Sequence, residues 1–185
     1  MCWEPVLWLG RSRSIRFSSE KQSPGGGIRQ LIAADFLRSA FMMDLSEIVE
    51  KINKRPNMAT SMGIDFFSTP EPDTCGARMR VDESSRQPMG FLSGGASLAL
   101  AETLAGAGSA TLCPDKICVG IQVSGSHVRA VPEGDTVTAL ARIVHQGQTL
   151  HVWNVDITDD QGRLVSTAHV TNYILSSPNG SVTQP

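Results

Sequence analysis

The pattern of apolar and polar positions predicts two helices in the middle of the chain. Apolar residues recur at helical spacing from Leu45 to Ile52, which predicts a short amphipathic helix over residues 45–54. Residues 94–112 are instead apolar nearly all round and consist mostly of Gly, Ala, Ser and Leu, with almost no β-branched side chain. A helix with such a surface belongs in a core, where its small side chains allow neighbouring elements to pack closely against it.

Six further segments have the composition and alternation of β-strands. Residues 63–69 and 75–82 form a pair before the long helix, separated by a turn that begins at Pro70. Four longer segments follow the helix: 117–130, 135–145, 149–158 and 164–175. The short loops between these four segments predict antiparallel neighbours. One buried helix with an antiparallel sheet wrapped around it is an α+β fold.

The length of 185 residues suits one domain with an additional arm. Residues 1–42 contain six basic and three acidic residues, a balance of +3, and show no sustained period. We expect this segment to be a poorly ordered N-terminal extension, either a targeting arm or the product of a start codon assigned too early. The folded domain is predicted over residues 43–176, and the polar residues 177–185 are predicted to fray.

Composition excludes several classes of partner. With 16 Lys and Arg against 18 Asp and Glu, the net charge of −2 gives no positive field for nucleic acid. No apolar run approaches the ~20 residues that a membrane-spanning helix needs. The four cysteines form no CxxC pair and have no histidine at zinc-finger spacing, so we expect no metal, no cofactor and reduced thiols in a cytoplasmic protein.

Glu102 is the first candidate for chemistry. It is the only charged residue between Arg86 and Asp115, and it lies within the most apolar predicted helix. Burying an unpaired carboxylate is costly, which favours a functional role as a general base or a nucleophile. The alternative is that Glu102 lies on the one solvent-exposed stripe of its helix.

A pair of glycines opens the long helix at Gly94. The free N–H groups of a helix start, approached closely through glycine, can hold an oxyanion; the alternative is a tight loop capped by Ser93. Glu102 lies eight residues after Gly94, about 12 Å away at a rise of ~1.5 Å per residue. One substrate carbonyl cannot contact both groups of one chain. A reaction that uses both therefore requires a homo-oligomer with its sites between subunits.

Three segments together resemble the hotdog-fold acyl-CoA thioesterases. They are residues 87–102 (Gln-Pro-Met-Gly-Phe-Leu-Ser-Gly-Gly-Ala-Ser-Leu-Ala-Leu-Ala-Glu), residues 126–129 (Ser-His-Val-Arg) and residues 147–153. The branch that they resemble contains 1,4-dihydroxy-2-naphthoyl-CoA, 4-hydroxybenzoyl-CoA and phenylacetate-pathway thioesterases. The resemblance extends over roughly residues 45–175. It implies an α+β hotdog fold, a homotetramer built as a dimer of dimers, and hydrolysis of an aryl-CoA or medium-chain acyl-CoA, with menaquinone biosynthesis as one setting.

The resemblance also implies roles for single residues. Glu102 matches the carboxylate that attacks the thioester carbonyl or activates water. Gln87 and the backbone N–H of Gly94 match the groups of the partner subunit that bind and polarise this carbonyl. The surface that binds the CoA nucleotide and pantetheine matches His127, Val128, Arg129, Gly147, Gln148 and Thr149.

Two positions depart from the family pattern. Ser93 stands where this branch usually has a histidine, so the site keeps a hydroxyl group there but has no titratable ring. Gly106 stands one helical turn after Glu102, where many members have Ser or Thr. These departures favour the alternative of a catalytically impaired acyl-CoA-binding protein. A hotdog dehydratase would need a histidine near the helix start, and Ser93 speaks against that class.

Overall fold

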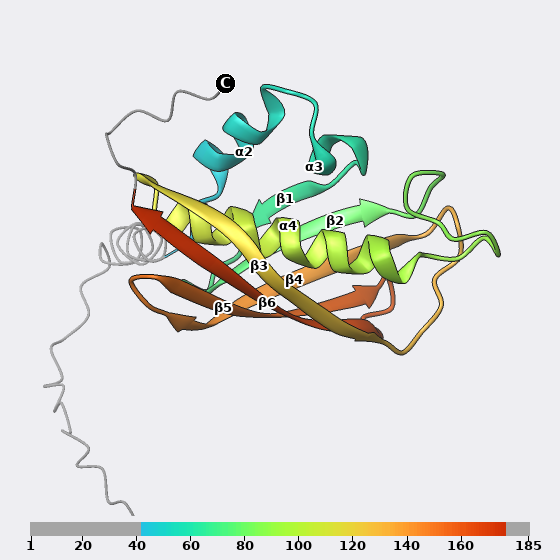
Figure 1. Ribbon diagram of the computed structural model, residues 1–185. Coiled ribbons are helices and arrows are strands. Elements are labelled where there is room, and N and C mark those ends of the chain that lie inside the picture. Colours follow the sequence, from blue (N-terminus) through green and yellow to red (C-terminus); the bar gives the residue numbers. More distant parts are fainter. Residues whose placement is uncertain (1–41, 177–185) are drawn as a thin grey trace, which may run out of the picture. The chain divides into compact units, whose positions relative to one another are not determined.

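The computed structural model describes residues 42–176, a range that contains both predicted helices and all six predicted strands (Figure 1). The predicted extension, apart from Met42, and the predicted tail 177–185 lie outside the described residues. The elements in chain order are α2 (Ser46–Asn53), α3 (Met58–Ser61), β1 (Asp65–Ser68), β2 (Thr74–Arg80), α4 (Gly94–Leu112), β3 (Lys116–His127), β4 (Thr136–Gln146), β5 (Leu150–Asp159) and β6 (Leu164–Ser176).

The long helix α4 has the bounds that the sequence predicts and lies in the concave face of the sheet (Figure 1). Leu100 and Leu104 are fully buried between this helix and the strands. The small side chains permit close packing: a Cβ atom placed on Gly108 would lie 2.6 Å from Cη2 of Trp153. The prediction that α4 forms the centre of the core is therefore confirmed.

The described strands form one antiparallel sheet in the order β1-β2-β4-β5-β6-β3. The expected antiparallel neighbours are confirmed for β4 with β5 and for β5 with β6. The same expectation is wrong for β3 and β4, because β3 pairs with β6 at the sheet edge and β4 pairs with β2. Their connection, residues 128–135, crosses the end of the sheet: Val131 in it is buried and its carbonyl accepts a hydrogen bond of 2.8 Å from Leu92 N.

The short helices contact each other and α4. Helix α2 begins and ends within a residue of its predicted bounds, and the Asp44 carboxylate accepts the Ser46 N–H at 2.9 Å. The sequence analysis missed α3, a single turn that begins with a capping box between Asn57 and Thr60. No helix in residues 42–176 is long and apolar enough to span a membrane.

Candidate active site

Glu102 lies on the side of α4 that faces the edge strand β3. Its side chain is half-buried and rests on Gly120, where a Cβ atom would lie 3.3 Å from the Glu102 carboxyl carbon and closer still to Oε1. The β3 register shifts between Gly120 and Gln122, so the strand is irregular at this point. Within residues 42–176 no hydrogen bond or ion pair occupies the carboxylate. It is therefore available to a substrate or to water.

Gln87 lies in the loop before α4, where its amide is already oriented. The Gln87 N–H donates to the Phe91 carbonyl at 2.7 Å, and the Met89 N–H donates to Gln87 Oε1, also at 2.7 Å. Because the side-chain oxygen is occupied, the amide presents its NH₂ group as the free partner. An NH₂ donor is the group that a thioester carbonyl would require.

The start of α4 is held by backbone contacts rather than by a side-chain cap. Ser93 is the N-cap residue in extended conformation and donates its N–H to Ser85 O at 2.9 Å. Ser93 is thus the N-cap residue that the alternative expected, although within residues 42–176 its hydroxyl makes no capping hydrogen bond. The first N–H groups of α4 have no partner inside the helix, which leaves them free to bind an oxyanion.

His127 packs against the same helix start. A Cβ atom on Gly94 would lie 2.8 Å from both Cδ2 and Nε2 of the His127 ring, so only glycine leaves space for the imidazole here. The ring is held by Ser166, whose Oγ lies 2.9 Å from His127 Nδ1. Gly94 and His127 are thus neighbours within one chain.

The predicted CoA-binding residues fall into two separate groups. His127 pairs with Ser166 at the end of the sheet near the α4 N-terminus. The turn 147–149 lies at the other end of the sheet. The residue after it, Leu150, pairs with Tyr173 of β6, and Tyr173 pairs with Val119 near the start of β3. Eight strand residues separate these ends, about 26 Å at ~3.3 Å per residue. One chain does not bring the two groups together.

A buried polar cluster under α4 was missed by the sequence analysis. The Ser109 hydroxyl lies 2.9 Å from Trp153 Nε1, 2.9 Å from Asn172 Nδ2 and 3.1 Å from His151 Nδ1. Burial lowers the pKa of His151, and the nearby His145 and Lys116 act in the same direction. His151 is therefore a buried core residue with a hydrogen-bond partner. The sequence feature that could have indicated this cluster is a polar residue at an inward-facing strand position, which is His151 in β5 and Asn172 in β6.

The cysteines and acidic residues of the described region form no second candidate for a nucleophilic or metal site. Cys75, Cys113 and Cys118 are free, and burial raises the pKa of Cys75 to about 12 and that of Cys118 to about 11. These two thiols are therefore protonated at neutral pH and poor nucleophiles. Among residues 42–176, no three His, Cys, Asp or Glu side chains are grouped as metal ligands would be.

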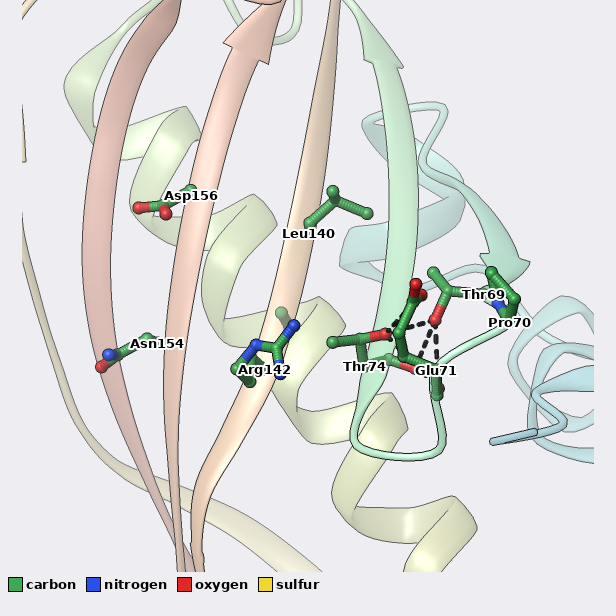
Figure 2. A pocket seen from close by; sticks show the side chains of 9 residues that line it. Thr69, Pro70, Glu71, Thr74, Leu140, Arg142, Asn154 and Asp156 are labelled. Atoms are coloured by element: carbon green, nitrogen blue, oxygen red, sulfur yellow. Dashed lines mark hydrogen bonds between the residues drawn. The ribbon is translucent and has the colours of Figure 1, made fainter. Parts of the chain in front are cut away.

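Figure 2 shows a hollow on the sheet face that is turned away from α4. Its lining residues are Thr69, Pro70, Glu71, Thr74, Leu140, Ala141, Arg142, Asn154 and Asp156. Arg142, the one cation among them, forms an ion pair of 2.7 Å with Asp73 at the rim. No predicted site residue lies in this hollow. The candidate active site is therefore on the α4 side of the sheet.

Comparison with known proteins agrees with this architecture. Residues 89–166 match the family model of the thioesterase superfamily. ComA2 of Bacillus subtilis, a protein named as an esterase, is 38% identical over 122 residues, which are 65% of this chain and 95% of ComA2. The 1,4-dihydroxy-2-naphthoyl-CoA hydrolase of Escherichia coli is 38% identical over 56% of this chain and 76% of its own length. A mutant of thioesterase PA1618 from Pseudomonas aeruginosa superposes with a TM-score of 0.66 at 31% identity, covering 72% of this chain and 95% of that structure.

The chain belongs to the thioesterase superfamily. The predicted hotdog fold, an antiparallel sheet wrapped around a long central helix, is confirmed, and so is the prediction that the chain is a thioesterase. The roles of the single site residues stay predictions.

The contact between Glu102 and Gly120 leads to the first testable prediction. We expect Gly120→Ala to lower kcat about tenfold, because the added methyl group must displace the carboxylate. Stability should hardly change, since alanine is acceptable in an edge strand. Steady-state kinetics and thermal unfolding measure both effects. Ser124→Ala, on the same strand but paired with the outward-facing His169, is the matched control and should leave kcat unchanged.

Proposed function

We propose that this protein hydrolyses acyl-CoA thioesters to the free acid and CoA, with Glu102 as base or nucleophile. The observation on which this proposal rests most is the half-buried Glu102 carboxylate, which lies on Gly120 at the sheet edge without a hydrogen-bond partner in the described chain. As nucleophile, Glu102 attacks the thioester carbonyl and the thiolate of CoA leaves. As base, it removes a proton from water while the water oxygen attacks the same carbon.

The carbonyl oxygen develops negative charge in either mechanism and needs donors. We assign this role to Gln87 Nε2 and the Gly94 N–H of a second copy of the chain, because the same chain's Gly94 lies about 12 Å from Glu102 at ~1.5 Å per helical residue. Gln87 suits the role since its Oε1 is already bonded to Met89 N.

The edge strand β3 supports an assembly of at least two copies. It is twelve residues long, has no neighbour on its outer side within the described sheet, and exposes Val119 by 38% and Ile121 by 58%. Long apolar edges are normally covered. Antiparallel pairing of two β3 strands would place the α4 start of one copy toward the opposite end of the other. A dimer of two such dimers is the assembly that the family resemblance implies.

The same pairing would unite the two separated groups of CoA-binding residues. At each end of the paired sheet, His127, Val128 and Arg129 of one copy would lie on the same side as the turn 147–149 of the other copy. Arg129 supplies a guanidinium group for a CoA phosphate. Its Nε donates to the Leu164 carbonyl at 3.3 Å, which holds the side chain at the end of the sheet.

The acyl group is proposed to be an aryl group or a medium-chain alkyl group. Support comes from the E. coli relative, which hydrolyses 1,4-dihydroxy-2-naphthoyl-CoA, and from the small residues of α4, which leave space beside the helix. A second candidate is acyl-CoA binding without turnover, which Ser93 and Gly106 favour because both remove groups that the family uses. A cytoplasmic location stays a prediction.

Thiol release from a panel of CoA thioesters tests the function. We expect steady-state release of CoA from aryl or medium-chain alkyl thioesters, followed by a thiol reagent in the presence of the full chain. Tight binding of these thioesters without release would instead establish the binding protein. If neither binding nor release is measured, the proposed function is wrong.

A further inference from the structure

Among the side chains of residues 42–176, one buried nitrogen or oxygen atom has no hydrogen-bond partner. It is Oδ1 of Asn172, in a residue that is only 1% exposed on the inner face of β6. A buried carbonyl oxygen without a donor is destabilising, and such atoms in folded proteins usually accept a hydrogen bond from a water or a ligand.

The hydrogen bonds of its neighbours determine which way the Asn172 amide faces. Trp153 Nε1 is a donor only, so it must donate to Ser109 Oγ. Asn172 Nδ2 lies 3.0 Å from the Ala105 carbonyl and 2.9 Å from Ser109 Oγ. With the amide reversed, two oxygens would face each other at Ala105. The nitrogen therefore points at α4 and the oxygen points away from the Ala105 carbonyl, because only this orientation avoids a repulsive contact between two oxygens.

The register of the sheet places this oxygen near the candidate carboxylate. Asn172 pairs with His151 of β5 on one side and with Gly120 of β3 on the other. Its nitrogen shares Ser109 with His151 and Trp153 on the β5 side, which turns the oxygen toward β3. Directly opposed Cβ positions lie about 4.5–5.5 Å apart. The Cβ position of Gly120 is the point on which Glu102 rests.

The helix leaves open space one turn after Glu102. Gly106, one turn after Glu102, has no side chain, and a Cβ atom there would meet nothing within 4 Å. An ionised Glu102 and the Asn172 oxygen both accept hydrogen bonds and neither can donate to the other. A molecule with two hydrogens on one oxygen satisfies both acceptors at once.

We propose that Asn172 Oδ1 and the Glu102 carboxylate together hold the hydrolytic water. This inference rests on the proposed function and assigns Glu102 the role of base. The water donates one hydrogen to Asn172, which keeps the water oriented, and transfers its other proton to Glu102. Its oxygen forms the new bond to the thioester carbon, the carbon–sulfur bond breaks, and the departing CoA thiolate recovers the proton from Glu102.

The test compares variants that remove the Asn172 oxygen with a variant that removes the Ser109 hydroxyl beside the Asn172 nitrogen. Asn172→Leu and the smaller Asn172→Ala both remove Oδ1, and either should lower kcat at least tenfold with KM changed less than threefold. Ser109→Ala disrupts the buried cluster but keeps Oδ1, so kcat should fall less than threefold although the melting temperature drops. If Asn172 has only a structural role, kcat should instead fall with the melting temperature in all three variants, including Ser109→Ala.

Two substrates distinguish water from a donor on the acyl group. Benzoyl-CoA and 4-hydroxybenzoyl-CoA should lose kcat equally in both Asn172 variants, because the water is common to both reactions. A loss confined to the hydroxylated substrate, or unchanged kcat in folded Asn172 variants while Glu102→Gln is inactive, would overturn the inference and leave the proposed function intact. A wild-type chain that releases no CoA from any thioester would overturn both.

Discussion

Replacing Glu102 by glutamine is expected to lower kcat at least a hundredfold on any thioester that the wild type hydrolyses. Glutamine has the shape of the glutamate side chain and fits over Gly120, but it neither accepts a proton nor attacks a carbonyl as a carboxylate does. A hundredfold loss corresponds to about 2.7 kcal/mol of lost transition-state stabilisation, at ~1.36 kcal/mol for each factor of ten. The measurement is steady-state CoA release with KM determined alongside kcat.

The control for this substitution is an ordinary surface glutamate. Glu83 is exposed in the loop after β2, and Glu83→Gln should leave kcat within twofold of the wild type. Binding of the substrate by the Glu102→Gln variant, measured without turnover, should be retained. Activity that survives in Glu102→Gln would remove this carboxylate from the mechanism and direct attention to the groups at the α4 start.

The sequence predicted most of the local structure, and particular residues explain why. The glycine pair at Gly94 and the break after Leu112 define α4 to the residue, because a stretch of small apolar side chains without β-branching has few other stable conformations in a domain of this size. The distance between Gly94 and Glu102 along the same helix predicts a site shared between two copies of the chain, and this stays a prediction.

The remaining features depend on contacts between distant segments. The position of β3 beside β6 could not be read from loop length, because residues 128–135 cross the end of the sheet instead of forming a hairpin. Gly120 has no local feature that distinguishes it from other strand glycines, because its contact with Glu102 comes from a different element. The partners of Ser109, at positions 151, 153 and 172, come from two strands, so their hydrogen bonds follow from register alone.

Trp153 connects this polar cluster to the core, and its removal is expected to be the most destabilising change. The side chain is fully buried, its ring lies against Gly108, and its Nε1 donates to Ser109 Oγ at 2.9 Å. Trp153→Ala should reduce the free energy of unfolding by about 3–5 kcal/mol, the range for large-to-small aromatic substitutions in cores. Urea unfolding at one fixed protein concentration measures the loss, since assembly makes stability depend on concentration.

Trp153→Phe separates packing from hydrogen bonding at the same position. Phenylalanine keeps an aromatic ring in the core but has no N–H, so Ser109 loses one donor and the variant should lose less, about 1–3 kcal/mol. If both variants lose the same amount, the hydrogen bond to Ser109 rather than the ring accounts for the contribution of Trp153. A loss below ~1 kcal/mol in Trp153→Ala would contradict the burial of this side chain against α4. The intermediate loss expected for Trp153→Phe follows from a contact in which the ring packs against Gly108 of α4 and Nε1 meets one polar group of the same helix, the Ser109 hydroxyl.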